Sequence, residues 1–420
     1  MIKIPKCVLF TKELMANTDS IKKIYLVGGA IRDYLLGFPT KDKDYVAVGS
    51  DEKDFINYPK VGKIFPVFLI DSHTQIALAR TETKTTNGYN GFSYQTKNIT
   101  LIQDLKRRDL TINSMALDLQ TRHIIDPFNG KKDLQNKILR HTSQAFCEDP
   151  LRVLRIARFR AKLGIKWKIH PSTKALIYTM KKELKFLEPN RIYQETITAL
   201  SYKNSHLFFE TLFELGVLEE IFPSIYALTT LKEGSLYHLE SSVFVHTMEV
   251  LKLLCSNSTL LKLTALYHDI AKPYTYRHFG NSNGHDNPKI VESLIDMQIP
   301  KNIKKQMLIL IANHIKISHL SQMRPNKILH FFESFNKDKM LLKAQIKLFY
   351  ADQKGRISDY KIPSLPLKLI FKIFDALQNY SPQEWIISQT NKPSGDTIKN
   401  YVLNSKIKLI QNILQKENCL

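Results

Sequence analysis

With 420 residues the chain is long enough for two to four domains, because single domains usually run to about 100–200 residues. A composition that is 43% hydrophobic and 24% charged excludes a wholly disordered chain and is typical of globular proteins. The 61 Lys and Arg residues against 39 Asp and Glu residues give a net charge of +22, which favours a polyanionic partner such as nucleic acid, although Lys-rich codon usage in an AT-rich genome would also produce an excess.

The cysteines and the hydropathy pattern bear on the cellular compartment. Four cysteines lie far apart without a Cys-X-X-Cys pair, so neither a disulfide framework nor a zinc ribbon is indicated. No cleavable signal pattern stands at the N-terminus, and no apolar run reaches about 18 residues. We therefore expect a cytoplasmic protein that does not enter membranes.

A glycine turn follows the first predicted strand. Residues 24–27 form a short apolar run, the glycine pair at 28–29 allows a tight turn, and residues 30–36 have helical spacing. Backbone N–H groups at the start of a helix favour a bound anion, and Arg32 in the first turn could pair with the same anion. The order strand, turn and helix is therefore typical of a phosphate-binding loop.

Two carboxylates follow on the next predicted strand. In residues 41–48 acidic and basic side chains alternate, so that Asp42 and Asp44 share one face. Proteins usually hold Mg²⁺ with one or two carboxylates plus substrate phosphates. Alone, a glycine turn is more often only a turn, and an Asp-X-Asp pair is more often a solvated strand end. Their closeness along the chain favours a joint phosphate and metal site.

Strands and turns continue to about residue 140. Further strands are predicted at 65–70 and 75–80, and residues 81–98, rich in Thr, Asn and Gly, predict a mobile loop. A basic turn at 106–108 precedes an apolar run. Arg108 there could contact a triphosphate bidentately; the alternative is a solvated basic turn.

A helix is predicted to begin at residue 150. Asp149 and Pro150 suit the N-cap and the first helical position. Arg152, Arg155 and Arg158 are three residues apart and would line one side of this helix. Asp149 and Arg152 could then read a base edge while the other two arginines meet phosphates. The alternative is a capped basic helix that faces solvent.

The rest of the chain is predicted to be almost wholly helical, because apolar residues recur three and four apart. The clearest helices are expected at 151–163, 172–187, 191–200 and 206–215. In the C-terminal half, imidazoles and carboxylates on separate helices could hold a metal that activates water against a phosphoester. They are His246, His268, Asp269 and Asp352. Judged by spacing alone, such histidines are more often satisfied core or surface groups.

Five motifs resemble, in order and spacing, those of the bacterial class II CCA-adding enzymes: VGGAIRD at 27–33, KDKD at 41–44, RRDLTIN at 107–113, DPFNG at 126–130 and EDPLR at 148–152. The resemblance covers residues 21 to about 225. It implies an α+β protein, with a polymerase-β-like nucleotidyltransferase head of mixed sheet and helices followed by an all-helical neck, body and HD domain. It also implies an enzyme that adds C, C and A to the 3′ end of tRNA from CTP and ATP without a nucleic-acid template.

The resemblance also implies roles for single residues. Asp42 and Asp44 would hold Mg²⁺ and carry catalysis, and Glu82 is a candidate third carboxylate. Asp149 and Arg152 would present a Watson–Crick-like edge to CTP or ATP. The other implied nucleotide-binding residues are Gly29, Arg32, Arg108, Arg155 and Arg158. The loop at 81–98 is the candidate for movement between the C and A additions.

Residues 265–272, ALYHDIAK, resemble the signature of HD-type phosphohydrolases, a domain that follows the transferase in the longer CCA enzymes of gammaproteobacterial type. This resemblance implies 2′,3′-cyclic phosphodiesterase, 2′-nucleotidase and phosphatase activities. The implied ligands of a divalent transition metal, Ni²⁺ among the candidates, or of Mg²⁺ are His246, His268, Asp269 and Asp352; His285 and His314 are candidate groups for the surrounding shell or a second metal. Ala271 stands where this family usually has glycine and could tighten packing near the metal.

The expected domains are an extension at 1–20, a head at 21–140, a neck and body at 141–225, an HD domain at 226–360 and a helical tail at 361–420. Two other functions stay open. One is a poly(A) polymerase, which shares the head; the other is an HD phosphohydrolase whose transferase-like head only binds tRNA. Both a monomer and a homodimer are compatible with the sequence.

Overall fold

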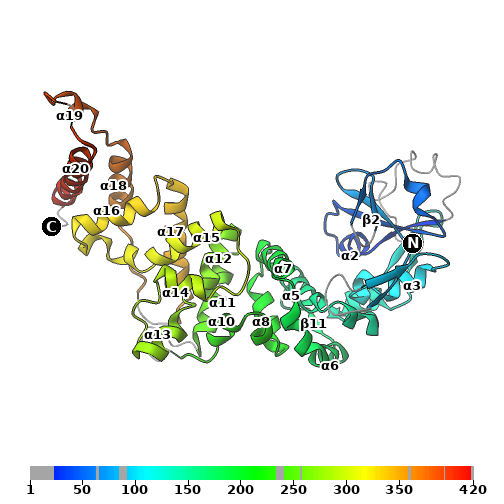
Figure 1. The fold of residues 1–420 in the computed structure, drawn as a ribbon. Coiled ribbons are helices and arrows are strands. Elements are labelled where there is room, and N and C mark those ends of the chain that lie inside the picture. Colours follow the sequence, from blue (N-terminus) through cyan, green and yellow to red (C-terminus); the bar gives the residue numbers. More distant parts are fainter. Residues whose placement is uncertain are drawn as a thin grey trace. The chain divides into compact units, whose positions relative to one another are not determined.

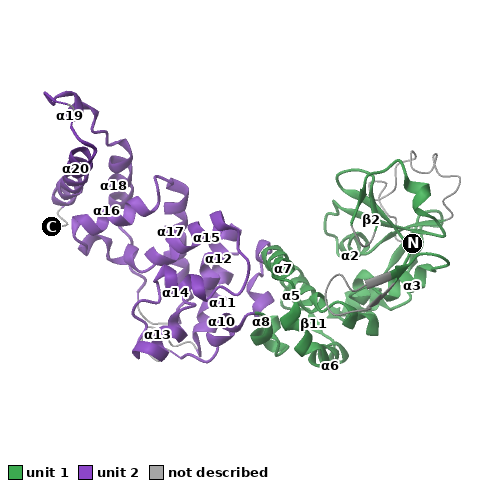
Figure 2. Cartoon of the chain, in the orientation of Figure 1, with its two compact units in different colours: residues 1–199, 210–221 green, residues 200–209, 222–420 purple. Residues whose placement is uncertain are grey.

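Two units make up the chain in the computed structural model, which describes residues 23–62, 66–84, 92–232, 241–255, 258–357, 361–391 and 393–417. The first unit comprises residues 1–199 and 210–221, and the second comprises residues 200–209 and 222–420 (Figure 2). The arm expected at residues 1–20 lies outside the described residues.

A seven-stranded mixed sheet forms the N-terminal part of the first unit (Figure 1). Its order is β3-β4-β5-β2-β1-β8-β9, in which β2 and β5 pair in parallel and all other neighbours are antiparallel. The strands are β1 Lys23–Val27, β2 Lys43–Val48, β3 Lys60–Val61, β4 Val67–Leu69, β5 Thr74–Leu78, β8 Ala116–Asp118 and β9 Ile124–Ile125. The mixed sheet confirms the predicted fold class of the head.

The register between β1 and β2 places the glycine turn beside the acidic strand. Val27, the last residue of β1, pairs with Asp44 of β2. Gly28 follows with a φ of 73°, a conformation that glycine adopts without strain, and helix α2, Gly29–Leu35, begins immediately after it. The predicted order of strand, turn and helix is therefore confirmed.

One face of the sheet is covered by helix α3, Leu101–Lys106. Tyr25 and Val27 point to the same side of β1, and they pack with Leu101 and Leu105 in one buried cluster. This cluster supports the C-terminal end of β1, directly before the glycine turn.

A β-hairpin occupies most of the segment for which a loop is predicted at 81–98. Strands β6 Thr81–Lys84 and β7 Phe92–Gln95 pair antiparallel, and residues 85–91 between them lie outside the described residues. The loop prediction is wrong at these two ends. Threonines and aromatic residues, which favour strands, outweigh there the Gly and Asn residues of the centre.

Helices dominate after residue 140, as predicted. The helices of the first unit beyond α3 are α4 Gly130–Asn136, α5 Leu151–Leu163, α6 Pro171–Met180 and α9 Leu218–Ile221; α7 Pro189–Ser201 and α8 His206–Glu214 span the division between the units. Short 3-10 segments add Glu52–Phe55, Thr111–Asn113, Gln144–Glu148 and Lys181–Phe186. The single helix expected at 172–187 is thus α6 followed by a 3-10 turn, and a two-residue parallel pair joins β10 Ile138–Leu139 to β11 Lys168–Ile169.

The described part of the second unit is helical. Its helices are α10 Pro223–Ala227, α11 Val243–Leu253, α12 Thr259–Tyr267, α13 Lys272–Phe279, α14 Pro288–Ser293, α15 Lys301–Asn313, α16 Pro325–Ser334, α17 Lys339–Gly355, α18 Leu367–Asn379, α19 Gln383–Ile387 and α20 Gly395–Lys416, with a 3-10 segment at Lys316–Gln322. Helices α11, α12, α15 and α17 pack together, and α20 packs against α16 and α18. A Cβ atom at Gly355 would lie 2.7 Å from Val250 Cγ2, so glycine permits the close approach of α17 to α11.

Within the described ranges, no helix is both long and apolar enough to cross a lipid bilayer.

Candidate functional site

A cavity of about 880 Å³ opens in the first unit between the end of β1, helix α2, strand β2 and helix α5. Its walls include both predicted catalytic aspartates and all the predicted nucleotide-binding residues. They are Gly29, Arg32, Asp42, Asp44, Arg108, Asp149, Arg152, Arg155 and Arg158. The fold thus brings together three segments that are far apart in the sequence.

The glycine turn lies directly against a basic side chain. A Cβ atom at Gly28 would lie 3.1 Å from Arg108 Nη1, so a larger residue would crowd this guanidinium. The Gly28 N–H donates to Met115 O at 3.3 Å and is therefore engaged within the fold. Arg108, rather than this N–H group, supplies donors beside the turn.

Arg32 is buried and held in place from several sides. Its Nη1 donates to Asn113 Oδ1 at 2.5 Å, and its Nη2 lies 2.8 Å from Asp33 Oδ1. Its guanidinium carbon also lies 4.9 Å from the ring centre of Phe159 on α5, a distance suited to a cation–π contact. These contacts fix the cation at the cavity wall.

The two aspartates project from the start of β2. Strand β2 begins at Lys43, so Asp42 precedes the strand instead of belonging to it as predicted. Asp42 Oδ1 lies 3.0 Å from His73 Nδ1, and Asp44 Oδ1 accepts a hydrogen bond from Gln75 Nε2 at 2.7 Å. Among the described residues, the second oxygen of each carboxylate has no hydrogen-bond partner. Two such oxygens on the cavity wall fit the donor set that Mg²⁺ prefers.

A buried carboxylate anchors two of the basic residues. Asp104 Oδ1 lies 2.7 Å from Arg107 Nη2, and its Oδ2 lies 3.1 Å from Arg108 Nη2. Burial alone would raise the pKa of Asp104, but the two guanidinium groups lower that pKa to about 2. Asp104 therefore stays ionised and orients Arg108.

The arginines of α5 are held by carboxylates or by a backbone carbonyl. Arg155 Nη2 lies 2.7 Å from Asp109 Oδ2, and Arg158 Nε donates to Glu195 Oε2 at 2.6 Å. Arg152 is buried, with Nη1 donating to Ala145 O at 2.5 Å. A solvent-facing basic helix, the alternative for this segment, is therefore wrong.

Asp149 lies just before α5 and contacts a further arginine. Helix α5 begins at Leu151 with Pro150 at its N-cap, one residue later than expected, so the prediction that Asp149 is the N-cap is wrong. The Asp149 Oδ1 nevertheless accepts from the N–H of Leu151 at 3.1 Å. Arg191 on α7 donates from Nη1 to Oδ1 at 3.3 Å and from Nη2 to Oδ2 at 2.8 Å. This bidentate contact fixes the plane of the carboxylate.

Sequence reasoning missed four polar residues that organise this cavity. Asp109 and Asn113 lie within the motif RRDLTIN at 107–113. An acidic residue inside such an apolar run predicts a buried side chain with a polar partner. Arg191 and Glu195 carried only a weak signal, because charged residues four apart on a predicted helix are typical of a solvated face. The side chain of Glu82 lies outside the described residues.

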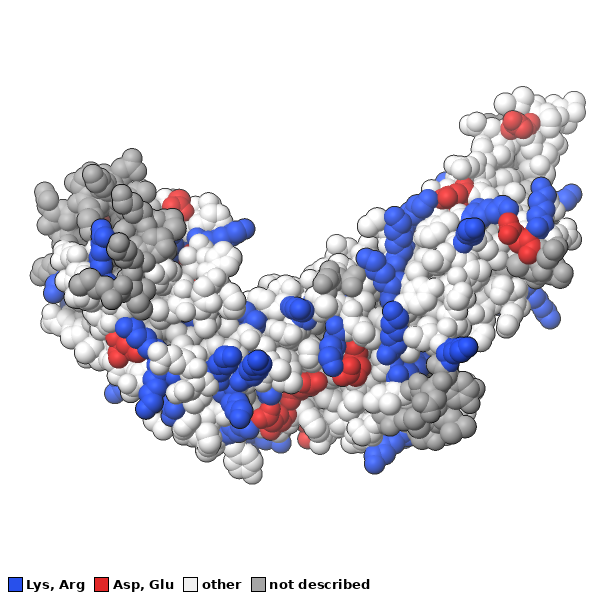
Figure 3. Space-filling view, turned by 180° about the vertical axis from the view of Figure 1, so that it is seen from behind, with Lys and Arg blue, Asp and Glu red and all other residues white. Residues whose placement is uncertain are grey.

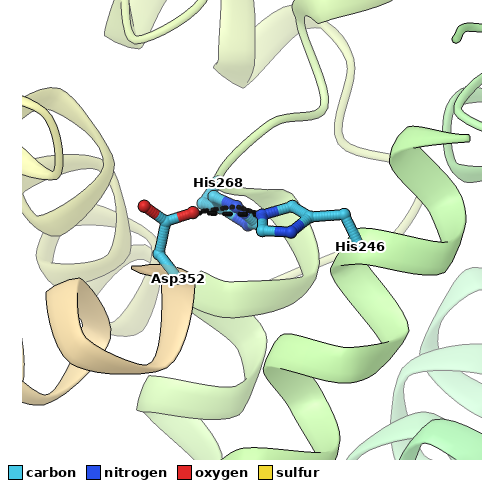
Figure 4. A group of neighbouring side chains, drawn as sticks. All are labelled: His246, His268 and Asp352. Atoms are coloured by element: carbon cyan, nitrogen blue, oxygen red, sulfur yellow. Dashed lines mark hydrogen bonds and ion pairs between the residues drawn. The ribbon is translucent and has the colours of Figure 1, made fainter. Parts of the chain in front are cut away.

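A second cluster lies in the second unit, where three helices converge (Figure 4). His246 of α11 has its Nε2 3.0 Å from Oδ1 of Asp352 on α17 and 3.3 Å from Nε2 of His268, which follows α12. His268 Nε2 lies 3.5 Å from the same Asp352 oxygen. All three side chains are buried and point toward one another, as ligands of a single ion would.

The acidic members of this cluster have lowered pKa values. Burial alone would raise the pKa of Asp352, but hydrogen bonds from His246 and His268 and the charge of Arg356 hold it well below its ordinary value. Asp269 also has a lowered pKa, because His268 and Lys272 outweigh its burial. Its Oδ2 lies 3.2 Å from His268 Nε2 and 2.9 Å from Lys272 Nζ. The donor set of imidazoles and carboxylates fits a divalent transition metal.

Ala271 does not strain the backbone beside this cluster. Its φ of −87° and ψ of −5° lie in the ordinary helical region, so glycine is not required there. The side chain is buried just before α13.

Comparison with known proteins gives two family matches and several similar structures. Residues 24–140 match the model described as "Poly A polymerase head domain", and residues 167–228 match that described as "Probable RNA and SrmB- binding site of polymerase A". A CCA-adding enzyme in apo form II has 18% identity and a TM-score of 0.65, with 99% of this chain and 96% of that chain covered.

Two further structures come from named organisms. The Bacillus stearothermophilus CCA-adding enzyme in complex with CTP has 19% identity and a TM-score of 0.62, with 98% of this chain and 94% of that chain covered. The Thermotoga maritima CCA-adding enzyme complexed with tRNA_CCA has 19% identity and a TM-score of 0.57, with 94% and 90% covered. At these identities the similarity establishes a shared fold.

Proposed function

We propose that this chain, whose residues 24–140 form a poly A polymerase head domain and whose fold is that of CCA-adding enzymes, adds and repairs the 3′-terminal CCA of tRNA. The substrates are CTP and ATP, and no nucleic-acid template is used. One observation carries the proposal: a single cavity gathers the aspartate pair, the glycine turn and the Asp149–Arg152 pair. We place the reaction in the cytoplasm, because the four cysteines lie far apart and indicate no disulfide framework.

The floor of the cavity would bind the triphosphate. Arg32 and Arg108 are held by carboxylate and amide partners with their guanidinium groups at the cavity wall, where they can donate to phosphate oxygens. Asp42 and Asp44 would hold Mg²⁺, which when bound supplies charge stabilisation for the transferring phosphoryl group.

The reaction follows from this arrangement. The 3′-hydroxyl of the RNA attacks the α-phosphorus of the nucleotide, the new P–O bond forms, and the bond to pyrophosphate breaks. The hydroxyl proton passes to solvent water, and pyrophosphate leaves as the free anion. Arg32 and Arg108 stabilise the charge on the departing pyrophosphate, because both are fixed before the substrate binds.

Base selection would be made by protein hydrogen bonds. Asp149 offers acceptors and Arg152 offers donors on the same end of α5, which is the complement that a base edge requires. Arg191 holds the Asp149 carboxylate in one plane. A preoriented pair rejects bases with the wrong donor pattern, since their polar groups would stay unpaired.

The polyanionic substrate agrees with the charge of the chain. On the face drawn in Figure 3, Lys and Arg side chains clearly outnumber Asp and Glu side chains over both units. Basic surfaces bind nucleic acid through its phosphates, largely without regard to sequence. Part of the predicted RNA-binding region, residues 167–228, lies in each unit.

The second cluster supports a further activity on RNA ends. His246, His268, Asp269 and Asp352 would hold a divalent transition metal, Ni²⁺ among the candidates, or Mg²⁺, and the metal when bound would supply activated water. The corresponding activities are 2′,3′-cyclic phosphodiesterase, 2′-nucleotidase and phosphatase. Hydrolysis of 2′,3′-cyclic AMP with added Mn²⁺, Ni²⁺ or Mg²⁺ tests this, and His246→Ala should abolish it while CCA addition continues.

A product-length assay tests the transferase on tRNA that lacks its 3′ end. Incorporation of CTP and ATP should stop after three nucleotides. Long tails made from ATP alone would instead support a poly(A) polymerase, and no incorporation would support an HD phosphohydrolase whose head only binds tRNA.

The aspartate pair offers the sharpest variant for that assay. Asp42→Ala with Asp44→Ala should lower the rate at least about 1,000-fold, because metal stabilisation of a phosphoryl group is worth several kcal/mol. Glu219→Ala, an exposed carboxylate on α9, is the matched control and should leave the rate unchanged. An unchanged rate in the double variant would refute the metal assignment.

A further inference from the structure

Three guanidinium groups gather around the ring of Phe159 on α5. The guanidinium carbons of Arg32 and Arg158 each lie 4.9 Å from the ring centre, and that of Arg155 lies 6.0 Å from it. Phe159 is 4% exposed and belongs to the wall of the cavity. A cation within about 6 Å of an aromatic ring centre is attracted by the negative face of the ring. One buried side chain therefore contacts three cations of the cavity wall.

The two closer contacts are also the better shielded from water. The side chains of Arg32 and Arg158 are 5% and 14% exposed, whereas that of Arg155 is 36% exposed. The attraction between a cation and a ring is stronger where water is excluded. Arg32 and Arg158 therefore depend most on the ring, and Arg155, at the limit of the distance range, depends on it least.

The ring joins cations from two elements. Arg32 lies on α2, directly after the glycine turn, and Arg158 lies on α5. Each cation has a carboxylate on another side: Arg32 Nη2 lies 2.8 Å from Asp33 Oδ1, and Arg158 Nε donates to Glu195 Oε2. These two carboxylates belong to different segments of the chain. Both guanidinium groups contact Phe159, so its ring sets the position of one relative to the other.

A ring can hold a cation without reducing its attraction for an anion. A carboxylate partner brings a negative charge, which opposes the approach of a phosphate group. An aromatic ring has no net charge and attracts the cation through its quadrupole. Phe159 therefore fixes the guanidinium groups of Arg32 and Arg158 and leaves their charge to act on a bound phosphate.

We propose that Phe159 is a positioning residue for the nucleotide triphosphate, and that its ring holds Arg32 and Arg158 at the spacing that the phosphate groups require. The proposal rests on the proposed function, since it takes the cavity to be the nucleotide site. CTP and ATP carry the same triphosphate. Loss of the cation–π contacts should therefore weaken the binding of both nucleotides by the same factor.

Fluorination of the ring tests the proposal, because fluorine withdraws electrons from the π face and changes the volume of the ring only slightly. Full chains are prepared with phenylalanine that carries no, one, two or three fluorine atoms at position 159. Calorimetric titration with CTP or ATP and Mg²⁺, in the absence of tRNA, gives the dissociation constants without nucleotide transfer. Each added fluorine should raise both constants, to a total of roughly 10-fold.

Phe55 is the matched control. It is buried, stacks on Phe68 with 5.1 Å between the ring centres, and is not part of the cavity wall. The same fluorinations at position 55 should leave both dissociation constants unchanged. Phe159→Leu removes the ring and keeps an apolar side chain, so it should weaken binding by at least roughly 10-fold. Circular dichroism checks the fold of each chain.

The outcomes separate positioning from packing. Dissociation constants that stay unchanged along the series at position 159 overturn the proposal, because a ring that only fills space would keep binding intact. Equal losses at positions 159 and 55 also overturn it. A loss for one nucleotide alone overturns the phosphate role and indicates a role in base selection. If the unmodified chain binds neither nucleotide, the proposed function itself fails, and this inference fails with it.

Discussion

The carboxylate of Asp109 lies 2.7 Å from Arg155 Nη2 and so joins the segment after α3 to helix α5. Asp109 also accepts from Asn113 Nδ2 at 2.9 Å, and Asn113 in turn accepts from Arg32 Nη1. Burial alone would raise the pKa of Asp109, but Arg155 and Asn113 hold it well below its ordinary value. A continuous chain of polar contacts therefore connects helix α5, proposed to read the base, to Arg32, proposed to bind phosphate.

Asp109→Asn should loosen this connection. The substitution leaves the Arg155 charge without its main partner, and loss of one member of a buried pair costs on the order of 2–3 kcal/mol after allowance for the partial exposure of Arg155. We expect a lower melting temperature of the first unit and a higher KM for both nucleotides. An unchanged KM would mean that the connection does not position Arg32.

Arg191→Ala should reduce base selectivity. The bidentate contact fixes Asp149, and a hydrogen bond to a charged group contributes about 1.5–3 kcal/mol, so we expect kcat/KM for CTP and ATP to fall roughly 10- to 100-fold relative to GTP and UTP. Arg191→Lys keeps the charge but loses the planar fork and should recover only part of the selectivity. A uniform fall for all four nucleotides would instead indicate a role in phosphate binding.

The start of α5 could be predicted to within one residue from the residue types at that position. The ion pairs that its arginines make with distant residues could not be predicted from the sequence. Asp149 and Pro150 favour a capped helix through their own backbone preferences. The partners of Arg155 and Arg158 are 46 and 37 residues away, and no local pattern specifies such contacts. The hairpin β6-β7 was missed for a related reason, because a turn-rich centre hides the pairing of its two ends.

Asp296 should make the stability of the second unit depend on pH. Burial raises its pKa to about 6, although the N–H and hydroxyl of Ser224 partly offset this effect. The folded state therefore holds the proton more tightly than the unfolded state, so that the stabilisation is complete below about pH 4 and is lost as the pH rises through about 6. By neutral pH this effect has lowered the free energy of unfolding by on the order of 2–3 kcal/mol.

Asp296→Asn provides the measurement for this pH dependence. At about pH 4 the variant and the parent should unfold at similar denaturant concentrations, because both side chains are neutral there. At about pH 7.5 the variant should be more stable, since the amide carries no charge to bury. If the variant and the parent differed in stability by the same amount at both pH values, the raised pKa of Asp296 would be contradicted.

Gly130→Ala should destabilise the first unit. A Cβ atom at Gly130 would lie 2.4 Å from Thr111 O and 3.0 Å from Met115 Cγ. Such overpacking typically lowers the free energy of unfolding by about 1–3 kcal/mol. Gly395→Ala is the matched control, because a Cβ atom there, at the start of α20, would have no described neighbour within 4 Å. Calorimetry should give a lower melting temperature for the first variant and an equal or higher one for the second.

The pairing of Val27 with Asp44 has a consequence for tolerated changes in chain length. The glycine turn and the acidic strand keep their relative position through backbone hydrogen bonds between β1 and β2, and not through the connection that joins α2 to β2. Extra residues at 37–40 would leave Val27 and Asp44 paired. One extra residue within β1 would shift the pairing and turn every following side chain to the opposite face of the sheet. Natural length variation among related chains should therefore concentrate at 37–40 and avoid the strands on either side.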